Sequence, residues 1–228
     1  EDLLAGPIQG ELLGAEHLGE RAQVVAGAQH LAAAGRARRR TPLLARLART
    51  RQILAQAQER LSAPENAGDV GPAGEWLLDN YHLIQEHIDD EKDSLPRGYY
   101  RELPELADGP LAGYPRVYEL AITLISHSEG RVDLANVSGF VGAFQQVAVL
   151  TLGELWALPA MLRLGLIENV RRMALRTVQR LDELERRLGT RLAKHDQAIS
   201  EILGAIRALM SPPPAKGRPI GFVRPKDQ

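Results

Sequence analysis

Residues 73–116 read AGEWLLDNYHLIQEHIDDEKDSLPRGYYRELPELADGPLAGYPR, and this stretch contains the pattern that indicates the fold. In residues 94–115, four prolines and three glycines interrupt any regular helix and predict an elbow rich in proline, glycine and tyrosine. Before the elbow, apolar residues recur at α-helical spacing and predict an amphipathic helix that begins near Pro72, with acidic side chains on its wet face. The apolar residues assigned to the single core stripe of this helix are Trp76, Leu77, Tyr81, Ile84 and Ile88.

Helical spacing of apolar residues continues through nearly the whole chain, and no run shows the alternation of a strand. The predicted fold class is therefore all-α, a multi-helix bundle with the elbow inserted. Asp133 predicts an N-cap, and Thr151 with Glu154 predicts a capping box at the start of another helix. The other helices are expected at about residues 14–33, 42–61, 116–127 and 134–148.

Beyond residue 180 the apolar spacing averages about 3.5 residues, which is the seam spacing of a coiled coil. This predicts a long C-terminal helix that self-associates and ends at Ser211-Pro-Pro-Pro214. We expect a helical domain over residues 1–175, a coiled-coil-like helix over 176–210 and a disordered Pro-rich tail over 211–228. The seam residues are Leu188, Leu192, His195, Ile199, Ile202, Ile206 and Leu209.

Composition limits the chemistry of the chain. It has 228 residues, a net charge of -1 and no cysteine, so disulfides, thiol nucleophiles and thiolate metal sites are excluded. The net charge argues against a globally nucleic-acid-binding surface. The N-terminus does not have the pattern of a secretory signal, and the longest uncharged run, residues 134–153, is too polar for a membrane span. One basic block free of acids is either a solvated face or a phosphate-binding patch: Arg36, Arg38, Arg39, Arg40, Arg46, Arg49 and Arg51.

Residues suited to catalysis are present but poorly arranged. His82 and His87 are five residues apart, which does not place two metal ligands on one helical face. The neighbouring acids Asp89, Asp90, Glu91 and Asp93 would point in different directions on a helix. We therefore predict no catalytic residues, no metal site and no cofactor, and expect the chain by itself not to be an enzyme.

The residues most suited to contacts lie in and before the elbow, where aromatic faces adjoin arginine and asparagine edges that fit a sugar or a protein partner. The alternative is that the tyrosines and the tryptophan only pin the elbow to the core. The candidate contact surface comprises Trp76, Asn80, Arg97, Tyr99, Tyr100, Arg101, Tyr114 and Arg116.

A family resemblance adds to this interpretation. The segments GPI at 6–8, GELL at 10–13, EWLLDNYHLIQEHI at 75–88, LPRGYYRELPELADGPLAGYPRVYEL at 95–120 and LTLGELWALPAMLRLGLIENVRR at 150–172 resemble the N-terminal soluble region of bacterial cyclic β-1,2-glucan synthases. These are large inner-membrane glycosyltransferases that also carry a phosphorylase-like part. The resemblance covers about residues 6–172 and implies a region upstream of the transferase and the membrane helices, so no catalytic residue is carried over.

Residues 188–222 depart from that family and resemble the C-terminal coiled-coil tail of KilA-N-related phage-type regulators. Two functions follow. The first is a non-catalytic accessory domain of a synthase-like glycosyltransferase, as a fragment or fusion, in the cytoplasm or at the cytoplasmic face of the inner membrane. Its partners would be other parts of the synthase or the glucan chain. The alternative is a regulatory protein that self-associates through its C-terminal helix and contacts nucleic acid through the basic block.

Overall fold

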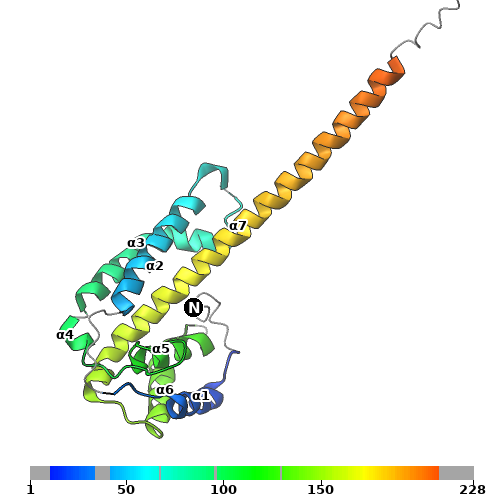
Figure 1. Cartoon of the computed structure of the whole chain (residues 1–228). Coiled ribbons are helices and arrows are strands. Elements are labelled where there is room, and N and C mark those ends of the chain that lie inside the picture. The colour runs from blue at the N-terminus through cyan, green and yellow to red at the C-terminus, as the bar shows by residue number, and fades with distance from the viewer. Residues whose placement is uncertain (1–10, 34–41, 67, 95–96, 129, 211–228) are drawn as a thin grey trace, which may run out of the picture. The chain divides into compact units, whose positions relative to one another are not determined.

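The structure is a computed structural model that describes residues 11–33, 42–66, 68–94, 97–128 and 130–210, without the side chains of residues 93, 94, 97 and 208–210. Within these ranges it contains helices and two isolated bridges but no strand, so the all-α prediction is confirmed. In Figure 1 the helices are α1 (Ala15–Ala28), α2 (Pro42–Leu61), α3 (Gly71–Ser94), α4 (Arg97–Tyr100), α5 (Arg116–His127), α6 (Leu134–Gln145) and α7 (Leu152–Met210), with a 3-10 turn, η2, at Pro64–Asn66.

Several helix ends follow from local sequence. Asp133 caps α6 by accepting a hydrogen bond from the backbone N–H of Asn136 at 2.8 Å. The capping box at the start of α7 is also present, since Glu154 N–H donates to the Thr151 hydroxyl at 3.2 Å and Thr151 N–H donates to the Glu154 carboxylate at 2.8 Å. Helices α2 and α5 occupy the predicted ranges.

Two helices are shorter than predicted. Helix α6 ends at Gln145 instead of residue 148. Helix α1 ends at Ala28, because the chain after it pairs with the elbow instead of continuing the helix. There the N–H of Ala32 donates to the carbonyl of Glu105 at 2.9 Å, and the N–H of Ala107 donates to that of His30 at 2.8 Å. This partner lies more than seventy residues away, so local spacing could not reveal it.

The chain divides into two compact units after Leu181. The first unit holds α1–α6 and residues 152–181 of α7. The second unit is described over residues 182–210, which form the remainder of α7. The predicted domain boundary between residues 175 and 176 stays a prediction. The predicted tail at 211–228 lies outside the described residues.

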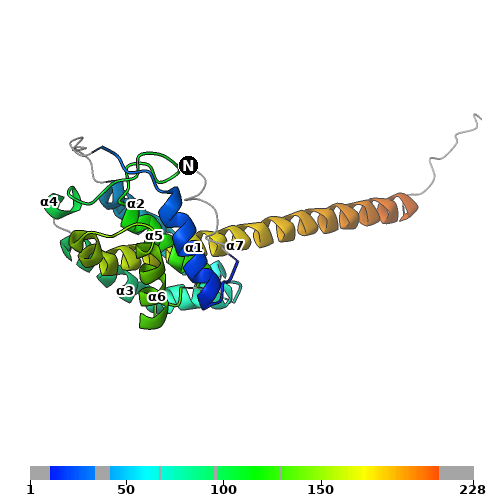
Figure 2. The same cartoon turned by 90° about the horizontal axis from the view of Figure 1, so that it is seen from below.

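Each of the described α-helices contributes side chains to the core of the first unit. Helix α1 packs on α5 and α6 (Figure 2), and α2 packs on α3 (Figure 1). Residues 152–181 of α7 run antiparallel to α3, because Thr177 lies beside Gly74 near one end of α3 and Arg163 pairs with Glu91 near the other. The side chains at the centre of this packing are fully or almost fully buried: Leu54, Leu77, Leu124, Phe144 and Met161.

None of the described helices combines the length and the apolar composition that crossing a membrane requires.

Candidate functional site

The tyrosines of the elbow, residues 94–115, pack it against the helices of the first unit. The Tyr99 hydroxyl donates a hydrogen bond to the carbonyl of Gly153 at the start of α7. Tyr100 is buried, and burial raises the pKa of its phenol far above the ordinary value. Tyr114 is partly buried and stacks on Tyr118, with ring centroids 5.6 Å apart. These contacts pack the elbow against the helices.

Arg116, the first residue of α5, forms a buried ion pair with Glu154 of α7. Its Nε and Nη2 lie 2.5 Å and 2.8 Å from the two carboxylate oxygens, and Nη2 also donates to the Val149 carbonyl at 2.7 Å. Burial alone would raise the pKa of Glu154, but hydrogen bonds from Arg116 and Thr151 outweigh burial and hold that pKa below its ordinary value. The pair therefore joins the end of the elbow to the capping box of α7.

The predicted contact surface does not form one surface. Tyr100 and Arg116 are buried, whereas Arg101 is exposed and the side chain of Arg97 lies outside the described residues. Residues 76 and 94 of α3 are separated by about 27 Å along the helix axis, at 1.5 Å per residue. Trp76 and Asn80 thus lie near one end of α3 and the elbow follows the other end. Binding by any of these residues stays a prediction.

The prediction that Trp76 belongs to the core stripe of α3 is wrong. Leu77, Ile84 and Ile88 are buried, but 47% of the Trp76 surface is exposed. Consecutive helical residues point about 100° apart, so Trp76 lies on the neighbouring stripe. That stripe consists of Trp76, Asn80, Leu83 and His87, which all line one groove.

This groove, of about 530 Å³, lies between α3 and α7. Its α7 side is formed mainly by apolar residues, among them Leu162, Leu166 and Val170. Leu83 on the α3 side is 43% exposed. The groove thus presents apolar surface from two adjacent antiparallel helices, and the sequence pattern of either helix alone did not reveal it.

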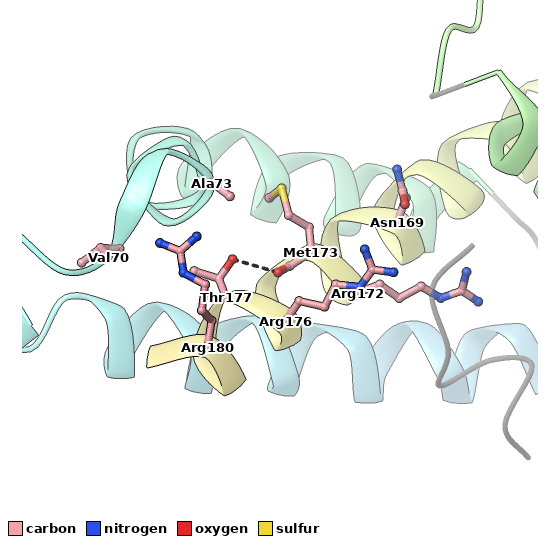
Figure 3. Close-up of a pocket in the computed structure, with 8 residues that line it drawn as sticks. All are labelled: Val70, Ala73, Asn169, Arg172, Met173, Arg176, Thr177 and Arg180. Atoms are coloured by element: carbon pink, nitrogen blue, oxygen red, sulfur yellow. Dashed lines mark hydrogen bonds between the residues drawn. The ribbon is translucent and has the colours of Figure 1, made fainter. Parts of the chain in front are cut away.

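A second cavity, of about 280 Å³, lies where the start of α3 faces α7 (Figure 3). Val70 and Ala73 line one side, and Arg172, Arg176 and Arg180 are among the α7 residues that line the other. Thr177, between the arginines, donates its hydroxyl hydrogen bond to the Met173 carbonyl at 3.0 Å. The cavity is therefore lined by cationic side chains that recur every four residues on one helix face.

The buried carboxylate of Glu168 is contacted by arginines from two helices, α2 and α7. Arg46 of α2 donates to it at 2.5 Å, Arg171 donates at 2.5 Å and Arg172 lies 3.5 Å away. Arg46 belongs to the basic block for which the sequence left open a phosphate-binding patch. In the structure its guanidinium pairs with the Glu168 carboxylate instead. Arg51 of the same block pairs with Asp89 at 2.5 Å, and residues 36–40 lie outside the described residues.

The candidate acids and histidines do not converge. Asp89 pairs with Arg51, and Glu91 is buried beside Arg163 at 2.9 Å. Burial, against the attraction of Arg163, raises the pKa of Glu91. Within the described ranges no group of three or more His, Cys, Asp or Glu residues could hold a metal ion. The side chain of Asp93 lies outside these ranges.

The self-association seam is exposed in the single chain. Leu188, Leu192, Ile199 and Ile202 each expose more than half of their surface, and His195 and Ile206 are also exposed. The side chain of Leu209 lies outside the described residues. No other described residue of the second unit packs against this seam.

Comparison with known proteins gives one informative similarity. The chain is 38% identical over 126 residues to the cyclic beta-(1,2)-glucan synthase NdvB of Rhizobium meliloti (strain 1021). This confirms the resemblance to cyclic β-1,2-glucan synthases. The matched region is 55% of this chain but only 4% of the length of that synthase. No family model matches the chain.

The similarity concerns a small part of a large synthase, so the activity of the whole relative is not transferred to this chain by the match. The resemblance of residues 188–222 to phage-type regulator tails stays a prediction, and residues 211–222 lie outside the described residues.

Proposed function

We propose that this chain is a non-catalytic helical interaction region of a glycosyltransferase similar to cyclic β-1,2-glucan synthases, and that its groove between α3 and α7 binds another part of that protein. The observation that supports this most is the exposed Trp76 in an apolar groove. Tryptophan is among the residues that most often dominate the energy of an interface. The similarity to the synthase supports the choice of partner.

The shape of the groove indicates an amphipathic helix as its occupant. The stripe from Trp76 to His87 extends about 16 Å along α3, which corresponds to three helical turns. A helix that lies in such a groove is anchored by apolar residues at positions i, i+3, i+4 and i+7. The matched region covers only 4% of the relative, so nearly all of a synthase of that kind lies outside it. The helix that we propose binds in the groove would belong to that remaining part.

Replacing Trp76 and Leu83 with alanine should therefore weaken partner binding strongly and leave the fold intact, because both side chains are partly exposed. The binding test mixes the chain with detergent-solubilised synthase NdvB that lacks its matched region and measures co-purification. Loss of a central tryptophan typically costs about 2 kcal/mol or more, so affinity should fall about thirtyfold or more.

Trp156→Ala is the matched control, since Trp156 is exposed but does not line the groove. This variant should bind as the unchanged chain does. The proposal fails if the unchanged chain does not bind the synthase, or if the Trp76/Leu83 variant and the control bind equally well.

A second candidate function, self-association through α7, is favoured by the exposed seam. Residues 188–209 alternate steps of four and three, which places Leu192, Ile199 and Ile206 at a positions and Leu188 and Ile202 at d positions. In a parallel pair of such helices, Arg191 at g would face Asp196 at e of the second copy. This charge complementarity indicates a parallel homodimer; nucleic-acid contact by the basic block has no comparable support.

Replacing Leu192 and Ile199 with aspartate is expected to convert the dimer to a monomer, because two charges per helix would enter the apolar seam. Light scattering measures the mass. The control is Ala193→Asp with Ser200→Asp, which adds the same charges one residue outside the seam and should leave the dimer unchanged. Deletion after Arg187 should also yield a monomer, and a monomeric unchanged chain would contradict the seam dimer.

A further inference from the structure

The cavity between the start of α3 and α7 has a lining suited to anions. The described side chains that line it include three arginines and one asparagine, and none of them is a carboxylate. Arg172 lies 3.5 Å from Glu168, one turn earlier on α7. Arg176 and Arg180 are exposed and form no ion pair with a carboxylate in the described part of the chain. The lining thus carries positive charge that is only partly neutralised.

Arg180 is placed directly against the first residue of α3. A Cβ atom added to Gly71 would lie 2.6 Å from Nη2 of Arg180, and Gly71 has a φ of 69°, so both the close approach and the backbone conformation favour glycine here. The first turn of α3 contains no acidic residue. A cation beside the positive end of a 24-residue helix is electrostatically unfavourable, and an anion between them would be attracted by both.

We propose that this cavity binds a phosphoryl oxyanion, either a free phosphate species or the phosphate of a small ester, held by Arg176 and Arg180 with Arg172 and Asn169 beside them. Arginine presents planar pairs of N–H donors that match the oxygens of a phosphoryl group. Several guanidinium groups together match the charge of a phosphoryl group better than they match the charge of a single carboxylate. The cavity volume of about 280 Å³ is sufficient for a phosphoryl group with a small substituent. This site is separate from the groove at Trp76, and it does not depend on the function proposed above.

The test is a calorimetric titration of the full 228-residue chain with pyrophosphate, inorganic phosphate and glycerol phosphate at low salt. Saturable binding is expected for at least one of these three probes, and their ranking distinguishes a free phosphate species from an ester. Arg176→Ala combined with Arg180→Ala should weaken binding about tenfold or more, because two sets of charge-assisted hydrogen bonds are lost. Both arginines are exposed, and the variant should keep the circular dichroism spectrum of the unchanged chain.

The control is Arg186→Ala with Arg187→Ala, which removes the same charge from α7 at residues that pair with Glu183 outside the cavity. This control should bind the probe as the unchanged chain does. If the alanine variant of the cavity unfolds, Arg176→Lys with Arg180→Lys replaces it, with a weakening still expected because an ammonium group lacks the paired donors.

Three results would overturn the site: no saturable binding of any phosphoryl probe, equal weakening in the cavity variant and the control, or displacement of the probe by acetate at equal concentration.

Discussion

Arg116→Ala is expected to lower the free energy of unfolding by about 3–5 kcal/mol, the range for breaking a buried ion pair by removing one partner. The substitution leaves the Glu154 carboxylate fully buried without its guanidinium, and it also removes the hydrogen bond to the Val149 carbonyl. Urea denaturation followed by circular dichroism measures the change. Because the pair joins the elbow to the start of α7, the loss should affect the unfolding of the whole first unit.

The control is Arg51→Ala, since the pair of Arg51 with Asp89 is exposed and its loss should cost at most about 1 kcal/mol. Replacing Arg116 with methionine and Glu154 with leucine together should recover much of the lost stability, because no uncompensated charge remains. Equal effects of Arg116→Ala and Arg51→Ala would show that burial of the first pair does not matter.

The same ion pair predicts a dependence of stability on pH. The pKa of Glu154 is held below its ordinary value in the folded chain. The carboxylate therefore makes its full contribution to the free energy of unfolding at a pH above the pKa that Glu154 has in the unfolded chain. The contribution is lost as the pH falls from that ordinary value through the lower folded-state pKa. Acid titration of Glu154→Gln should lack this component of the loss.

The second large effect is expected at Tyr100. Tyr100→Ala should destabilise the chain by about 3–5 kcal/mol, the range for truncating a buried aromatic side chain, because it leaves a cavity where the elbow meets the core. Only 2% of the Tyr100 surface is exposed. Thermal and urea unfolding measure the change.

Phenylalanine substitutions separate packing from hydrogen bonding at the two neighbouring tyrosines. The buried Tyr100 hydroxyl has no hydrogen-bond partner among the described residues, so Tyr100→Phe should be neutral or stabilising. The Tyr99 hydroxyl donates to the Gly153 carbonyl, so Tyr99→Phe should cost about 0.5–1.5 kcal/mol. A stabilising Tyr99→Phe together with a costly Tyr100→Phe would contradict this assignment.

These expectations change how a contact role for the elbow is tested. Loss of partner binding in Tyr100→Ala would reflect unfolding, because the side chain supports the core. The exposed Arg101 and the groove residue Trp76 are the informative positions, since neither is needed to fill the interior.

Local sequence was sufficient where one helix supplies all the interactions. The start of α2 at Pro42, the Asp133 cap and the capping box of Thr151 and Glu154 are made by residues within one turn of one another. The periodicity of α3 also identified Leu77, Ile84 and Ile88 as buried. It misplaced Trp76, because an apolar residue at the margin of a stripe can face the core or a groove, depending on the neighbouring helix.

The candidate sites depended on distant partners. Arg116 and Glu154 are separated by 38 positions, and Arg46 and Glu168 by 122, so spacing could not pair them. Arg116 was predicted to be a contact residue because arginine edges beside aromatic faces suit a sugar or a protein partner. Its buried carboxylate partner turns it into an interior residue.

The helical class of the chain and the starts of several helices could be predicted from sequence, because capping and periodicity are short-range properties. The similarity of part of the chain to a cyclic β-1,2-glucan synthase was recognised from the residues themselves. The packing of the helices was needed to see which polar residues are buried, that Trp76 lines a groove, and that three arginines line a cavity opposite the start of α3. Burial and charge pairing depend on which helices pack together, and α3 and α7 meet across more than seventy positions of sequence.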